Sequence, residues 1–307
     1  MEFKKITKKK NYQHSSHEVP SFLPQKSARA LRSKNQKGSI IEKKYTEKLT
    51  ISAKDTPVDT SWGSVSNWYD EHLQGKRTYH ETIIYPGLMR RLGDVRGVRI
   101  LDLACGQGIF SHKLALQGAN VIGVDLASEL IDIAKKVGSE KHHPDFFASP
   151  SHDLYMIKNA TVDTIIISLA LQNIERVKET FDECKRVLKK EGRMLLVLNH
   201  PSFRNPKESS WGYNEREKIQ YRRIDSYLSE SKIKIDMTPG SRTDKKFTYS
   251  FHRPLQFYSK FLEKAGFLIK RLEEWESDRE SEPGVRQLAE NKSRKEIPLF
   301  LLIEAVQ

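Results

Sequence analysis

Cysteine and long apolar runs are scarce in this chain. Only two cysteines, Cys105 and Cys184, occur among the 307 residues, and they lie far apart with no metal-binding spacing. This argues against a disulfide framework and a metal site, and it favours the reducing cytoplasm. No apolar run approaches the roughly 18 residues that span a bilayer, so we expect no membrane segment. The basic N-terminus also lacks the apolar stretch of a secretory signal.

Positive charge is concentrated at one end of the sequence. Residues 1–60 carry 14 Lys or Arg against 6 Asp or Glu, whereas the net charge of the whole chain is +13. The segment is rich in Lys, Ser and Gln and has little apolar periodicity, so we expect a basic, disordered tail. A solvated tail is one interpretation, and a weak contact with RNA or another acidic surface is the other.

From Ser61 onward, helical and strand patterns alternate. Segments 61–74 and 81–95 have helical spacing of their apolar residues. The strands expected after them are 98–104, 120–126, 145–149, 162–170, 192–199, 267–275 and 297–306, and the helices are 108–118, 128–138, 174–192 and 253–266. Alternation of this kind predicts a parallel sheet with helices on both faces. The charged stretch 277–296 is expected to be a loop, which makes the final strand pair antiparallel.

The stretch "ILDLACGQGIF", residues 100–110, joins the first expected strand to a helix. Asp102 ends the strand, Gly106 and Gly108 occupy the turn, and Asp125 ends the next strand. Parallel α/β sheets bind ligands beyond the carboxyl ends of their strands, where an acid can accept hydrogen bonds from ribose hydroxyls. A dinucleotide site would need a third glycine, but Ser111 stands there. The pattern therefore indicates a different nucleoside-containing cofactor.

Together with "VIGVDLA" and "LKKEGRMLLVLNHP", this stretch resembles the class I S-adenosylmethionine-dependent methyltransferases, especially the type 11 group with many small-molecule enzymes. The resemblance implies an α/β, Rossmann-like, doubly wound sheet of seven strands across 61–307. That sheet is mostly parallel with an antiparallel last strand and helices on both faces. It also implies S-adenosyl-L-methionine as the cofactor.

The resemblance further implies roles for individual residues. Asp102 would help to hold the amino group of the cofactor, Asp125 would hold the ribose hydroxyls, and Leu126 would flank the adenine. Ser149 stands where the family often has an acid that meets the adenine, and Gln172 would line the cofactor. The expected cofactor-binding set is Tyr69, Asp102, Ala104, Gly106, Gly108, Asp125, Leu126, Ser149, Ser168 and Leu169.

A long polar insertion, residues 200–253, follows the fifth strand, where family members often build a lid. Aromatic side chains beside Arg can bind a planar or anionic ligand. The alternative is a solvent-facing β-extension or a dimer contact. The expected substrate-binding set is Arg77, Arg204, Trp211, Tyr213 and Tyr221. His200 is the best candidate for a catalytic base, because its ordinary pKa suits proton transfer, and its alternative role is a turn histidine bonded to backbone.

The leading hypothesis is a methyltransferase acting on an O, N or C atom of a small molecule. Displacement at a sulfonium methyl is in line, so orientation is the main task, and a base is needed only for a protonated acceptor. Two alternatives stay open: an RNA- or ribosome-associated methyltransferase that uses the basic tail, and a non-catalytic nucleoside sensor. The sequence makes no prediction about the oligomeric state.

Overall fold

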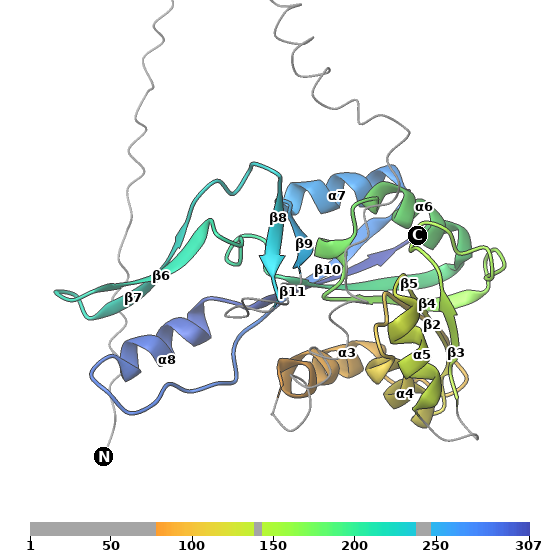
Figure 1. Ribbon diagram of the computed structural model, residues 1–307, viewed down its shortest axis with the longest axis horizontal. Helices are drawn as coiled ribbons and strands as arrows, with labels where there is room; N and C mark the ends of the chain where they lie inside the picture. Colours follow the sequence, from red (N-terminus) through yellow and green to blue (C-terminus); the bar gives the residue numbers. More distant parts are fainter. Residues whose placement is uncertain (1–77, 138–142, 238–246) are drawn as a thin grey trace, which may run out of the picture. The chain divides into compact units, whose positions relative to one another are not determined.

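The computed structural model describes residues 78–137, 143–237 and 247–307 (Figure 1). These residues all belong to one compact unit, Pro57–Gln307. The basic tail predicted for 1–60 and the helix predicted for 61–74 lie outside the described residues, and so do Tyr69 and Arg77.

Seven strands form the central sheet in the order β10-β11-β5-β4-β1-β2-β3. Strand β11 runs antiparallel to both of its neighbours, β5 and β10, and β1 to β5 are mutually parallel. Their bounds are β1 Arg99–Leu103, β2 Asn120–Asp125, β3 Asp145–Ala148, β4 Val162–Ser168, β5 Leu188–Asn199, β10 Leu268–Trp275 and β11 Phe300–Val306. The predicted seven-stranded sheet with an antiparallel last strand is therefore confirmed.

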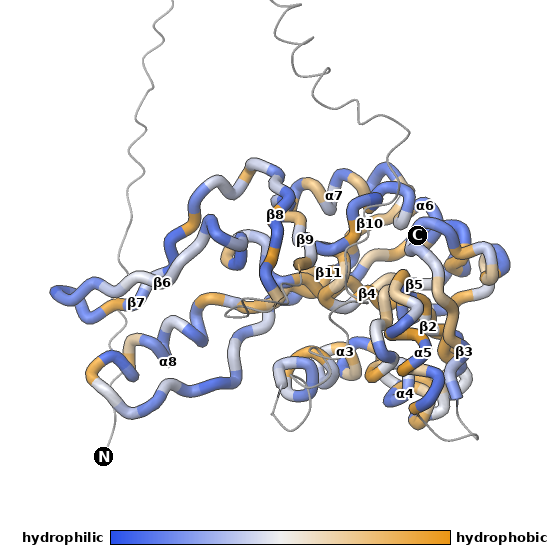
Figure 2. The backbone as a smooth tube through the Cα atoms, in the orientation of Figure 1, coloured by the Kyte–Doolittle hydropathy of each residue, from blue (hydrophilic) through white to orange (hydrophobic). Residues whose placement is uncertain are grey.

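Both faces of the sheet are buried, because alternate strand residues contribute to two separate cores. Leu101 and Ile165 pack with the helices α6 and α7, whereas Ile100 and Ile166 pack with α3 and α4 on the other face. Figure 1 shows α6 and α7 above the sheet and α3 and α4 below it, and Figure 2 shows hydrophobic residues both in the central strands and in the helices that cover them. The helices are η2 His80–Ile84, α3 Tyr85–Leu92, α4 Ile109–Leu116, α5 Ser128–Lys136, η4 Leu171–Asn173, α6 Val177–Val187 and α7 Leu255–Lys264.

The insertion after β5 forms two antiparallel hairpins in its described part. The first pairs β6 Ser209–Asn214 with β7 Ile219–Ile224, and the second pairs β8 Ser231–Asp236 with β9 Phe247–His252. Neither hairpin joins the central sheet. The insertion therefore builds the β-extension that was one of its two predicted forms, and whether it also closes over a ligand stays a prediction.

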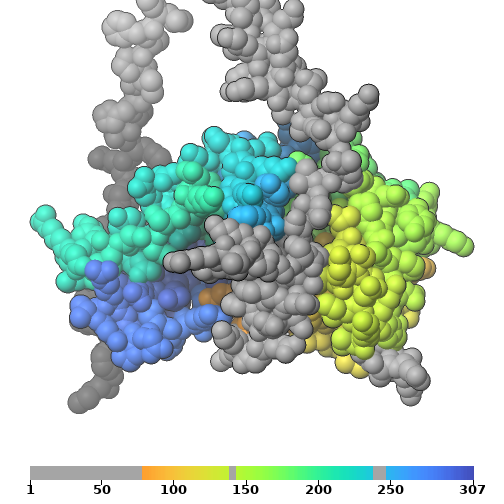
Figure 3. Space-filling model, viewed as in Figure 1, coloured from red at the N-terminus to blue at the C-terminus, as the bar shows by residue number. Residues whose placement is uncertain are grey.

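The stretch 277–296 is not the loop that its charge suggested, because it contains helix α8, Gln287–Glu296. The helix lacks an apolar stripe: Leu288 is exposed and its buried residue is Ser293. It is supported instead by tertiary contact with β7. Figures 1 and 3 show α8 beside the β6–β7 hairpin. The final strands are antiparallel, as predicted.

Two predicted helix boundaries were also wrong. Helix α6 ends at Val187 and the chain becomes extended at Leu188, with a register shift in its pairing to β4, so 188–192 is not helical. Ser128 does not cap α5, because the cap residue is Ala127 and its N–H donates to Asp125. None of the helices in the described ranges is long and apolar enough to cross a membrane.

Gly123 in β2 is required by close packing beneath the glycine loop. A Cβ added there would lie 2.5 Å from the Phe146 ring and 3.0 Å from the Cys105 sulfur. We expect Gly123→Ala to lower the free energy of unfolding by about 1–3 kcal/mol, since overpacking forces side chains from their rotamers. Urea denaturation measures the change. Gly284→Ala is the control, because its Cβ would meet only the Glu282 carbonyl oxygen at 4.0 Å, an ordinary van der Waals contact, and an equal loss in both variants would contradict this explanation.

Candidate functional site

The switch point of the sheet lies between β1 and β4. The chain proceeds from β1 to β2 and β3 on one side and then returns to β4 on the other. Each of these two strands is followed by a non-glycine residue in the left-handed region, Ala104 with φ 60° and Leu169 with φ 51°. Such backbone is unfavourable for side-chain-bearing residues, and it tends to cluster at ligand sites. A ligand site is therefore expected at the carboxyl ends of β1 and β4.

Asp125, at the end of β2, ties two loops together. Its Oδ2 accepts a hydrogen bond of 2.8 Å from the Gly106 N–H, and its Oδ1 accepts one of 2.9 Å from the Ala127 N–H. Burial raises the pKa of this carboxyl, and the bonds to Ala127 and Gly106 oppose that rise. Each carboxylate oxygen has lone pairs for a further donor. The bridge thus fixes the glycine loop and leaves acceptor capacity for a ligand.

The two glycines of the loop have different tasks. Gly106 has φ 57°, and a Cβ there would meet nothing within 4 Å, so its bare backbone borders open space. Gly108 has φ 77°, but a Cβ there would lie 2.6 Å from the Phe146 ring. Gly106 can admit a ligand against the backbone, whereas Gly108 permits the loop to pack on β3.

The carboxylate of Asp102 is buried at a cost in desolvation free energy. It is 2% exposed, and its Oδ2 accepts a hydrogen bond of 2.6 Å from the Ser111 hydroxyl. Burial raises the pKa of Asp102 to about 6, and the charge of Asp125 contributes to the rise. Two carboxylates in one buried region favour a cationic ligand, because a cation offsets their desolvation and mutual repulsion. Sequence reasoning missed Ser111, since nothing in its spacing marks it as the partner of Asp102.

Three buried polar atoms near this edge have no hydrogen-bond partner within the described part of the chain. They are Gln107 Oε1 in the glycine loop, Ser168 Oγ at the end of β4 and Gln172 Oε1 in η4. The Gln172 side chain is held in place by a bond of 2.5 Å from its Nε2 to the Leu169 carbonyl. Buried polar groups normally have a hydrogen-bond partner. Three that lack one at the switch point therefore indicate a bound molecule.

Leu126 and Ser149, two of the predicted cofactor-binding residues, lie beside Asp125, but only Leu126 offers a free side chain. Leu126 is 46% exposed and can cover a planar group. The Ser149 hydroxyl donates to the Asp153 carbonyl at 2.7 Å, and its N–H donates to the Asp125 carbonyl at 2.8 Å. Ser149 therefore shapes the turn after β3, and its hydroxyl hydrogen is already committed.

His200 lies at the end of β5 with both ring nitrogens engaged. Nδ1 accepts a bond of 3.2 Å from the Ser202 N–H, and Nε2 lies 2.8 Å from a Glu274 carboxylate oxygen. Burial lowers the pKa of the imidazole, although Glu274 opposes that shift. Because Nδ1 accepts the Ser202 N–H, that nitrogen carries no proton, and the ring proton lies on Nε2 toward Glu274. Glu274 was not among the predicted site residues, because it comes from β10, far away in sequence.

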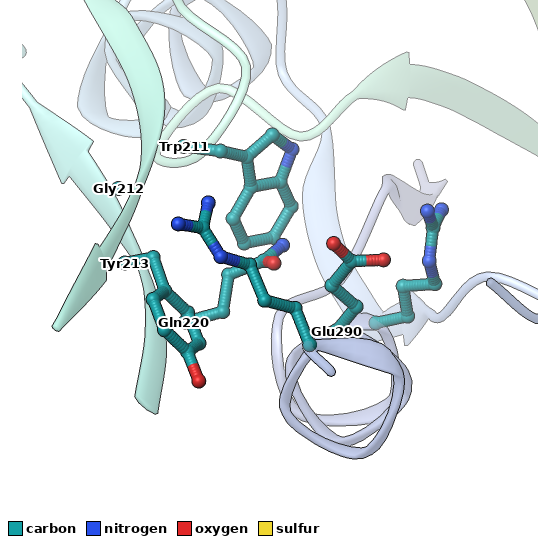
Figure 4. A pocket seen from close by; sticks show the side chains of 7 residues that line it. Trp211, Gly212, Tyr213, Gln220 and Glu290 are labelled. Atoms are coloured by element: carbon teal, nitrogen blue, oxygen red, sulfur yellow. The ribbon is translucent and has the colours of Figure 1, made fainter. Parts of the chain in front are cut away.

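The predicted substrate-binding residues do not form one group. Trp211 and Tyr213 share one face of β6 and line a pocket of about 340 Å³ against α8 (Figure 4). Tyr221 lies on the other face, where its ring covers Gly212. Arg204 is in the turn after β5, where its N–H donates to the His200 carbonyl. The pocket is completed by Gly212, Gln220, Arg286, Glu290 and Arg294.

Arg253 ties the insertion to the candidate site. It is 5% exposed, and its guanidinium donates to the carbonyls of Leu171 and Glu175, both at 3.2 Å. The same guanidinium lies over the rings of Phe251 and Phe257. Since Leu171 begins η4, this contact helps to position the segment that carries Gln172.

Comparison with known proteins gives a consistent result. Residues 101–196 match the family model described as "Methyltransferase domain". The chain is 28% identical over 151 residues to a ubiquinone biosynthesis O-methyltransferase of Xylella fastidiosa, and 28% identical over 146 residues to a demethylmenaquinone methyltransferase of Clavibacter sepedonicus. These alignments cover 49% and 48% of the chain, and 61% and 59% of those relatives.

A solved structure covers more of the chain. It is an S-adenosylmethionine-dependent methyltransferase from Mesorhizobium loti, with a TM-score of 0.57 and 25% identity. The alignment covers 72% of this chain and 96% of that protein. The fold is therefore shared over most of both chains, whereas the sequence match centres on β1 to β5.

The raised pKa of Asp102 predicts an effect of pH on stability. Its folded pKa of about 6 exceeds the ordinary 3.8, so the contribution of Asp102 to the free energy of unfolding falls as pH rises through about 4 to 6. Asn resembles the protonated acid, so we expect Asp102→Asn to be more stable at pH 7.5 by roughly 1–3 kcal/mol. Urea denaturation should show this gain vanishing below pH ~4. Asp145→Asn, at an exposed site, is the control, and a destabilised Asp102→Asn at pH 7.5 would contradict the explanation.

Proposed function

We propose that this chain transfers a methyl group from S-adenosyl-L-methionine to an O, N or C atom of a small molecule. Residues 101–196 match a methyltransferase domain, and the fold is shared with an S-adenosylmethionine-dependent methyltransferase. The single observation that carries the proposal is the convergence of Asp102, Gly106 and Asp125 at the switch point, with unpaired polar atoms beside them.

The residues at the switch point fit this cofactor. Asp125 would accept the ribose hydroxyls with its remaining lone pairs, and Leu126 would cover the adenine. The bare backbone of Gly106 would lie against the methionine part, whose ammonium group would neutralise Asp102. The unpaired Ser168 and Gln172 oxygens would line the methionine side. When bound, the cofactor supplies an electrophilic methyl group on a sulfonium.

The acceptor would approach from β4 and β5. The loops after β1 and β2 would hold the cofactor, which leaves the carboxyl ends of the next strands along the sheet for the second reactant. An acceptor held in line with the transferred methyl can gain on the order of 7–11 kcal/mol from orientation alone. The names of the relatives, one in ubiquinone biosynthesis and one acting on demethylmenaquinone, support a small-molecule acceptor here.

We propose a reducing compartment, the cytoplasm, for this reaction. Cys105 and Cys184 are both free thiols. Burial raises the pKa of each, well above its usual value, so both stay protonated and unreactive at neutral pH. Neither thiol is placed to act as a nucleophile, which leaves methyl transfer directly to the acceptor.

The proposal is tested by binding and by transfer. We expect the full chain to bind S-adenosylhomocysteine in calorimetry, and Asp125→Asn to weaken binding at least tenfold because the amide cannot accept as the carboxylate does. Asp163→Asn is the control. Asp163 lies near the start of β4, where its carboxylate pairs with Lys189. Labelled methyl groups from S-adenosylmethionine should enter small molecules of a cell extract. Binding without transfer would favour a sensor, and label in RNA would favour the RNA enzyme.

His200 was the predicted base, and its bonds now favour a role in the turn. To accept a proton, Nδ1 would have to exchange the Ser202 N–H for the acceptor. We therefore expect His200→Asn to lower kcat by less than tenfold, with no change in the shape of the pH–rate profile. Removal of a general base costs ~10²–10⁴ in rate, so a loss of that size would restore His200 as the base.

A further inference from the structure

The pocket between the β6–β7 hairpin and helix α8 lies away from the switch point. Its volume is about 340 Å³, near the lower end of the range for small-molecule sites. Figure 1 shows the hairpin and α8 projecting from the sheet on the side opposite to α4 and α5, which follow the loops of the candidate cofactor site. The proposed methyl transfer therefore gives this pocket no role.

The hairpin presents an aromatic face to the pocket. Its register pairs Trp211 with Arg222 and Tyr213 with Gln220. Cross-strand partners, and residues two apart on a strand, point to the same side of a sheet, so these four side chains share a face. The Arg222 guanidinium lies 5.1 Å from the Trp211 ring centroid, yet Trp211 lines the pocket and stays 44% exposed. Part of the indole is therefore open to a ligand.

Arg286 joins the helix to the hairpin and is already neutralised. Its guanidinium forms an ion pair with Glu215, and it lies 4.4 Å from the Tyr213 ring centroid. The Tyr213 ring is covered by this contact, so we do not assign it to a ligand. The binding capacity of the pocket therefore depends on its other polar residues.

Glu290 lines the pocket with a carboxylate that has no hydrogen bond or ion pair with another residue of the described ranges. Arg294 lies four residues later on α8, a spacing at which Glu and Arg commonly pair. Arg294 instead donates from Nε to the Ser281 Oγ at 3.1 Å. Figure 4 shows the Trp211 ring projecting from the hairpin and the Glu290 side chain projecting from α8 toward the same space. The pocket thus combines an indole surface with one unmatched charge of each sign.

The turn at Ser281 fixes the helix side of the pocket. The Ser281 N–H donates to the Asn291 Oδ1 at 2.7 Å, and the Ser281 carbonyl accepts a bond of 3.1 Å from the Gln287 Nε2. Together with the bond from Arg294, these contacts tie one residue to three positions of α8. The charged residues are therefore held in place before a ligand binds, which reduces the entropy lost on binding.

We propose that this pocket binds a free α-amino acid with a flat, apolar side chain. The ammonium group would bind Glu290, the carboxylate would bind Arg294, and the side chain would lie against the Trp211 ring. Both charges of an α-amino acid are attached to one carbon atom, so one molecule can bridge two residues about 6 Å apart along a helix axis. A ligand with a single charge would leave the other pocket charge unmatched. The site is independent of the proposed methyl transfer.

Three probes that share an indole ring and differ in charge test this site. L-tryptophan carries both charges, tryptamine carries the ammonium group alone, and indole-3-propionate carries the carboxylate alone. In calorimetry with the full chain, we expect tryptophan to bind about tenfold or more tighter than either other probe, since each bond to a charged group adds to affinity. Glu290→Gln should remove the advantage over indole-3-propionate, and Arg294→Gln the advantage over tryptamine. Because the Glu290 carboxylate has no partner, its substitution removes no contact from the fold.

Glu296→Gln is the matched control, because Glu296 lies at the end of the same helix, is exposed and does not line the pocket. Arg223→Gln, at an arginine that pairs with Asp225 at 3.0 Å, is the second control. Both should keep the preference for tryptophan, and excess S-adenosylhomocysteine should leave its affinity unchanged.

Three results would overturn the assignment. Tryptophan may bind no tighter than the better of the two singly charged probes, Glu290→Gln may keep the full preference, or S-adenosylhomocysteine may displace tryptophan. The last result would place the amino acid at the switch point instead. A wild-type chain that does not bind S-adenosylhomocysteine would refute the proposed methyl transfer alone, because the loss of affinity in Glu290→Gln would still locate tryptophan in this pocket.

Discussion

The carboxylate of Asp125 holds together the two loops on which the candidate site depends. It reaches from the end of β2 to the Gly106 N–H in the loop after β1, and it also accepts from the Ala127 N–H before α5. A single side chain thus links the glycine loop to the start of the next helix. It adds to the backbone bond from the Cys105 N–H to the Val124 carbonyl, which joins the same loop to β2.

The same region contains unfavourable electrostatic interactions. Burial raises the pKa values of Asp102 and Asp125, and the charge of Asp125 adds to the shift at Asp102. Left-handed backbone at Ala104 and Leu169 adds a further cost beside them. The raised pKa values and the left-handed backbone do not stabilise the fold. A cationic ligand that makes them favourable when it binds accounts for their concentration at the switch point.

Local patterns were sufficient to predict the sheet. Branched apolar runs marked β1, β2, β4 and β11, and turn glycines marked the ends of α4 and α7, so the alternating order followed. The pattern failed where tertiary contact decided the outcome. Helix α8 has no apolar stripe of its own and is supported by β7, and the stretch after Val187 leaves the helix to pair with β4.

The residues of the candidate site show the same distinction between local pattern and tertiary contact. Asp102, Gly106 and Asp125 could be identified because each lies at or shortly beyond the carboxyl end of a strand, so its place in the sequence predicts its place at that edge of the sheet. Ser111 as the partner of Asp102 and Glu274 as the partner of His200 depend on side-chain direction and on strand order. The predicted substrate set is divided for that reason. Trp211 and Tyr213 are two positions apart on β6 and share a face, whereas Tyr221 is paired with Gly212 and lies on the other face.

The guanidinium of Arg253 determines how this protein can be recombined with its relatives. Because it satisfies the carbonyls of Leu171 and Glu175 from inside the core, the insertion is not a cassette that can be exchanged by cutting at both of its ends. A chimera that replaced 200–253 with a loop lacking this arginine would leave the buried Leu171 carbonyl and the half-buried Glu175 carbonyl without this donor, and it would loosen η4. An exchange of the insertion between this chain and its relatives must therefore keep Arg253, or import the η4 segment with it.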